Sequence, residues 1–142
     1  MTAYDSGQIE PRIEPLVMAI RNCGFVTFSS CEGHKDYAAD PFRFASVVFF
    51  ADEDHARKVH EAIVARAGRL RCYWKLRGGF VRHRENIAQW ALGWILENCG
   101  AIDDANDEKD FVDHTVEAAW NHDIPLLVET FSALREQLSE SC

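Results

Sequence analysis

The chain contains no window of about 20 uninterrupted apolar residues, the length that a membrane-spanning helix needs. Its first twenty residues also lack the basic start and the apolar run of a secretory signal. The five cysteines are odd in number and widely spaced, which fits reduced thiols better than a disulfide framework. From these absences we expect a cytoplasmic protein with no membrane partner.

Internal repeats and low-complexity tracts are also missing from the sequence. With 142 residues, 47% of them hydrophobic and 27% charged, the chain has the size and composition of one folded unit with its own core. We therefore predict a single domain over residues 1–142, with a loose start over residues 1–12 and an acidic loop over residues 101–110.

Acidic residues outnumber basic ones, 23 to 15, which gives a formal net charge of −8. A whole surface of this charge does not favour nucleic acid or an anionic membrane. One segment is nevertheless basic: no acidic residue lies between Glu61 and Glu85, and one face of the strand expected there carries Arg69, Arg71, Tyr73, Lys75 and Arg77. We interpret this basic surface as a solvated strand face that balances the acidic stretch after Glu97, with RNA contact as the alternative.

Hydrophobic periodicity and turn residues predict the elements of the fold. Helices are expected over residues 14–24, 52–67, 85–98, 107–121 and 125–137, and strands over residues 25–30, 44–51, 69–77 and 80–83, with Gly78 and Gly79 turning the last two strands into a hairpin. The apolar residues of 85–98 cover more than one stripe, which indicates a central helix or half of a homodimer contact. The predicted class is α+β, a small mostly antiparallel sheet with helices packed on it and a helical C-terminal part.

The best candidate for a functional site is the stretch Thr27-Phe28-Ser29-Ser30-Cys31-Glu32-Gly33-His34, at the end of the first predicted strand. Backbone leaving a strand is free to curve, so side chains there can converge on a ligand. Cys31 and His34 could form a catalytic thiolate–imidazole pair, with the carboxylate of Glu32 or Asp36 steering the ring. The plainer alternative is a buried Cys31 thiol and a solvated His34.

Other residues of the same stretch suit the binding of a nucleotide-like or other anionic small molecule. The candidate ligand-binding residues are Thr27, Ser29, Ser30, Gly33 and Asp36. Serine hydroxyls and amides can hold phosphate or carboxylate oxygens, and glycine permits a close backbone approach or a positive φ. We rank this small-molecule function first, and a non-enzymatic interaction protein, an inhibitor or adaptor with segregated charges, second.

A metal-dependent hydrolase or deaminase ranks last. Cys31 and His34 offer two zinc ligands at a workable spacing, but zinc needs a third and usually a fourth. The remaining cysteines and histidines form no second close pair along the chain. The sequence by itself therefore predicts no metal ligands and less than one equivalent of zinc.

The motif Thr27-x-Ser29-Ser30-Cys31-x-Gly33, preceded by a helix and followed by a hydrophobic strand and a helix, resembles the wybutosine-synthesising tRNA methyltransferases. The motif of that family runs Thr-Ser-Ser-Cys-Ser-Gly-Arg, and the likeness covers about residues 14–67. The resemblance implies S-adenosylmethionine as cofactor, tRNA as partner and methyl transfer as the reaction. His34 departs from the pattern, because it replaces a permanent bidentate cation with a titratable ring.

Overall fold

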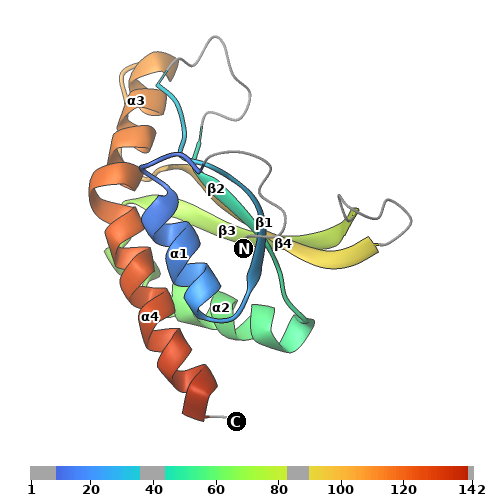
Figure 1. Ribbon diagram of the computed structural model, residues 1–142. Helices are drawn as coiled ribbons and strands as arrows, with labels where there is room; N and C mark the ends of the chain where they lie inside the picture. The colour runs from blue at the N-terminus through green and yellow to red at the C-terminus, as the bar shows by residue number, and fades with distance from the viewer. Residues whose placement is uncertain (1–8, 36–43, 83–89, 141–142) are drawn as a thin grey trace.

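The computed structural model describes residues 9–35, 44–82 and 90–140, which form helices and strands in the order shown in Figure 1. The elements are α1 (Glu14–Asn22), β1 (Val26–Cys31), β2 (Ser46–Phe50), α2 (Glu53–Ala65), a 3₁₀ turn (Ala67–Arg69), β3 (Cys72–Arg82), β4 (Trp90–Ala101), α3 (Glu108–Ala118), a π turn (Ala119–Asp123) and α4 (Ile124–Glu140). The predicted α+β class is confirmed.

The four strands form one antiparallel sheet in the order β1-β2-β4-β3. Cross-strand pairs place Val48 beside Ile95 and Arg77 beside Ile95, so these three residues form one row across β2, β4 and β3. β2 and β4 are the interior strands of this sheet. Their side chains alternate between two faces because successive residues of a strand point in opposite directions.

Helices α1, α2 and α4 lie against the same face of the sheet (Figure 1). The core between these layers contains side chains such as Leu16, Val47, Phe49, Leu96 and Phe131, none more than 1% exposed. Burial of this apolar surface is the main force that holds the layers together. In the described part of the chain, no helix is long and apolar enough to cross a membrane.

The helix expected over residues 85–98 is wrong: Trp90 to Ala101 form strand β4, and residues 85–89 lie outside the described part of the chain. A continuous apolar run does not by itself distinguish a central strand from a buried helix. Here the run pairs with β2 on one side and β3 on the other, which satisfies its backbone hydrogen bonds. Gly100 lies inside β4 with φ +124°.

The hairpin turn expected at Gly78 and Gly79 is also wrong, because β3 runs without interruption from Cys72 to Arg82. Gly78 lies opposite Trp94 on β4, and the indole ring of Trp94 occupies the space where a side chain at residue 78 would lie. The absence of a side chain at Gly78 therefore lets the Trp94 ring approach the backbone of β3. Close approach of this kind is a second role of strand glycines, besides turning the chain.

Replacing Gly78 with alanine should lower the free energy of unfolding by about 1–3 kcal/mol, because the new Cβ overpacks the site. An added Cβ would lie 2.5 Å from the Trp94 ring. Gly79 gives the matched control, since a Cβ there meets nothing within 4 Å. Urea denaturation of both variants checks this, and equal effects at the two positions would contradict it.

Candidate functional site

A β-bulge in β1 determines which residues of the predicted motif face outward. The pairing with β2 shifts between Thr27 and Ser29, after which Ser29 lies opposite Val48 and Cys31 opposite Ser46. Val48 and Ser46 belong to the face of the sheet opposite the buried Val47 and Phe49. The extra residue of the bulge therefore brings Ser29 and Cys31 onto this face, whereas Thr27 stays on the helix-covered face.

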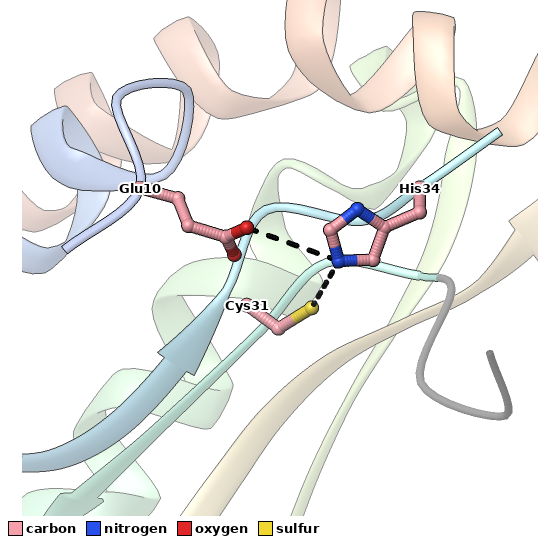
Figure 2. Close-up of side chains that lie close together, drawn as sticks. All are labelled: Glu10, Cys31 and His34. Atoms are coloured by element: carbon pink, nitrogen blue, oxygen red, sulfur yellow. Dashed lines mark hydrogen bonds and ion pairs between the residues drawn. The ribbon is translucent and has the colours of Figure 1, made fainter. Parts of the chain in front are cut away.

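Glu10, Cys31 and His34 converge at the end of β1 (Figure 2). The Sγ atom of Cys31 is 3.8 Å from Nε2 of His34, and Oε2 of Glu10 is also 3.8 Å from this nitrogen. One ligand atom from each residue lies within 4.8 Å of the others. All three residues are partly exposed, so solvent can reach the cluster.

The loop after β1 is held by contacts from two other segments of the chain. Oε1 of Glu10 accepts the backbone N–H of Glu32 at 2.9 Å, which leaves Oε2 for the His34 side. The indole of Trp120 donates to the carbonyl of Glu32 at 2.8 Å. Gly33 adopts φ +93°, a region that other residues rarely visit, and turns His34 back over Cys31.

The geometry fits metal ligation better than a proton relay. In a nucleophile–histidine–carboxylate triad, the nucleophile and the acid contact different ring nitrogens. Here Cys31 and Glu10 both approach Nε2 of His34. Ligand atoms around a tetrahedral zinc ion are about 3.3–3.6 Å apart, as follows from Zn–S and Zn–N bonds of about 2.3 and 2.0 Å. The two 3.8 Å separations are close to that range.

The remaining residues of the predicted site do not all lie on the same side of the sheet as Cys31. Ser29 and Ser30 line a hollow beside Cys31. Thr27 is 1% exposed, and its hydroxyl accepts from Nε of Arg21 at 2.8 Å, so it lies away from the ligand side. The carboxylate of Glu32 accepts the backbone N–H of Arg12 at 2.9 Å, an anchor for the loop in place of the expected ring-steering role. Asp36 lies outside the described residues.

Glu10 is the functional candidate that the sequence does not reveal. It lies 21 positions before Cys31, in the segment expected to be loose, and no motif spacing connects the two. Only the packing of the segment before α1 against the loop after β1 brings its carboxylate to His34. Tertiary structure therefore adds a third potential metal ligand beside Cys31 and His34.

Two residues of the basic surface, Arg71 and Arg77, pair with carboxylates of the same chain. Arg71 pairs with Asp103 at 3.3 Å, and Arg77 pairs with Glu97 at 3.2 Å, a hydrogen-bonded contact that raises the pKa of Arg77. Arg69 belongs to the 3₁₀ turn and not to β3. Such exposed pairs add little stability. The two pairs match the interpretation of a balanced strand face for Arg71 and Arg77, and RNA contact stays a prediction.

The other cysteines described, Cys23, Cys72 and Cys99, favour the protonated thiol. Burial raises the pKa of Cys72 to about 12, with a further contribution from the nearby Asp123 carboxylate. Burial also raises the pKa of Cys23 and of Cys99. Because metals bind the thiolate, these thiols are poor ligands and suitable controls for Cys31.

Comparison of the chain with models of protein families, with curated proteins and with solved structures finds no significant match. The resemblance to the wybutosine-synthesising tRNA methyltransferases therefore stays a prediction, as do the S-adenosylmethionine and tRNA that it implies.

Proposed function

We propose that the chain is a metal-dependent hydrolase in which Glu10, Cys31 and His34 hold one zinc-type ion. The observation that supports this is the approach of a sulfur and a carboxylate oxygen, each at 3.8 Å, to one ring nitrogen. Mixed sulfur, nitrogen and oxygen ligands suit Zn²⁺, whereas Mg²⁺ and Ca²⁺ take oxygen ligands. The sequence alone ranks a metal-dependent hydrolase last, because it shows only two ligands. The proposal ranks this function first, because Glu10 supplies the third ligand.

A zinc ion held by these three residues would keep a fourth position open to water, as in catalytic zinc sites, and would supply a nucleophile at neutral pH by lowering the pKa of that water to about 7. The Cys31 thiolate and the Glu10 carboxylate together balance the two positive charges of the ion. The partial exposure of all three ligands gives a substrate access to the open position.

A thiol-centred group transfer is the second candidate, and the 3.8 Å contact between Cys31 and His34 favours it. The two functions use the same sulfur in different ways, as a ligand or as a nucleophile. They make opposite predictions for alkylation by iodoacetamide. Zinc protects Cys31 from alkylation if it is a ligand and leaves the rate unchanged if it is a free nucleophile.

Purified, untagged protein is expected to bind one equivalent of zinc by elemental analysis after dialysis against the metal. Cobalt substitution should add a thiolate-to-metal charge-transfer band, because Cys31 is a ligand. Cys31→Ser should remove the band, and Cys99→Ser, at an exposed thiol, should retain it. Substoichiometric zinc together with no charge-transfer band in the wild-type protein would contradict the proposal.

A further inference from the structure

A hollow of about 440 Å³ on the outward face of the sheet adjoins the metal ligands. Its lining is shared by all four strands and consists of Ser29, Ser30, Cys31, Ser46, Val48, Arg77, Ile95 and Glu97. Cys31 belongs both to this hollow and to the cluster with Glu10 and His34. A molecule in the hollow would therefore lie beside a metal bound at Cys31.

The strand register arranges the residues of this face of the sheet as two rows. One row runs Cys31, Ser46, Glu97 and Lys75, and the other runs Ser29, Val48, Ile95 and Arg77. Three interstrand steps of about 4.8 Å separate β1 from β3, so each row spans about 14 Å. The row through Ser29 therefore has a hydroxyl on β1, an apolar middle and a cation on β3, whereas the row through Cys31 has Ser46 and Glu97 in its middle.

Charge at the β3 end favours an anion. Arg77 and Glu97 line this end and pair with each other at 3.2 Å, and Lys75, outside the lining, lies opposite Glu97 on β3. Burial and Glu97 raise the pKa of Cys99 on the neighbouring strand, and both cations oppose this rise, which agrees with their position on this face. Because Arg77 and Glu97 balance each other, the net positive charge beside the hollow comes from Lys75, on a chain whose formal net charge is −8.

We propose that this hollow is the substrate site of the metal centre and takes a small molecule with a phosphate or carboxylate group, about the size of a nucleoside monophosphate. The acidic group lies at Lys75 and Arg77, an apolar ring or chain covers Val48 and Ile95, and the opposite end lies at Cys31. A volume of about 440 Å³ falls in the usual range of small-molecule sites. The inference rests on the proposed function for its chemistry, whereas its binding interactions come from the sheet.

Adenosine 5′-monophosphate is the probe, and amide chemical shifts of the zinc-loaded protein are the measurement. The nucleotide should move the amide resonances of Ser29, Val48 and Ile95 in a saturable way. Adenosine, which lacks the phosphate, should bind about 10- to 100-fold more weakly, as expected from the loss of charge-assisted hydrogen bonds. Equal binding of both molecules, or shifts confined to other parts of the chain, would overturn the proposal.

Lys75→Gln and Arg77→Gln should each weaken nucleotide binding about tenfold or more. Arg57→Gln is the matched control, because Arg57 is an exposed arginine that pairs with Glu53 on α2. The cobalt band of each variant reports separately on the metal centre and on folding. If cobalt does not bind and the nucleotide shifts still map to the hollow, the metal centre is wrong and the anion site is supported without it.

Discussion

Replacing Asp123 with alanine is expected to lower the free energy of unfolding by about 3–5 kcal/mol, because it removes a buried carboxylate that satisfies several donors at once. The Asp123 side chain is fully buried. Oδ1 accepts the backbone N–H of Arg71 at 2.9 Å and Nδ1 of His122 at 2.7 Å. Oδ2 accepts the backbone N–H of Cys72 at 2.9 Å and the Trp74 indole at 2.8 Å.

Three of these four hydrogen bonds, those from Arg71, Cys72 and Trp74, connect the π turn Ala119–Asp123 to the beginning of β3. Alanine would leave two backbone N–H groups and an indole N–H at a largely buried position with no acceptor. Each buried donor without a partner costs about 1–3 kcal/mol, so three such donors give a loss of at least about 3 kcal/mol, and breaking a buried charged contact costs about 3–5 kcal/mol. The milder change Asp123→Asn would restore at most part of this network, because the amide nitrogen of the asparagine side chain is itself a donor.

Urea denaturation measures the effect of Asp123→Ala, with the free energy obtained by linear extrapolation. Asp104→Ala is the control, because Asp104 is an exposed residue of the acidic segment, and a change within about 0.5 kcal/mol is expected there. A loss below about 1 kcal/mol in the Asp123 variant would mean that water replaces the carboxylate and that the network is dispensable.

Local sequence patterns were sufficient for much of the fold. Asp52 accepts the backbone N–H of His55 and caps α2 as its position before an apolar stripe predicts. The solvated face predicted for the strand over residues 69–77 correctly includes Tyr73, which is 62% exposed. The errors lie where nonlocal pairing decides: the run from Trp90 to Ala101 is apolar enough for a buried helix, and only its two neighbouring strands make it β4.

The part of the candidate site formed by Cys31 and His34 could be predicted from the sequence. Strand β1 followed by Gly33 places Cys31 and His34 together, because both lie within four residues of one turn. Two further contributions could not be obtained from spacing. The bulge after Thr27 reverses which residues face outward, and Glu10 arrives from a segment that precedes α1. Both depend on packing between distant segments, which no local pattern encodes.

Glu10→Gln is expected to weaken zinc binding about 100-fold, because it removes a charged ligand from the proposed centre. Loss of an outer-shell partner already costs 10- to 100-fold, so loss of a ligand should be at least as severe. The glutamine side chain keeps a carbonyl oxygen that can accept the N–H of Glu32, and the loop contact at 2.9 Å can therefore persist. The variant thus tests the carboxylate charge with little change in loop anchoring.

Thermal unfolding measures this difference in zinc affinity, because a ligand that binds only the native state stabilises it. At a zinc concentration about 100 times the wild-type Kd, binding stabilises the native state by about 2.7 kcal/mol, whereas a 100-fold weaker site gives about 0.4 kcal/mol. The zinc-induced increase in Tm should accordingly fall from about 8 °C to about 1 °C. Glu14→Gln, a matched change in the first turn of α1, should keep the full increase. An undiminished zinc shift in Glu10→Gln would show that Glu10 is no ligand and would leave Cys31 and His34 with too few partners for a zinc site.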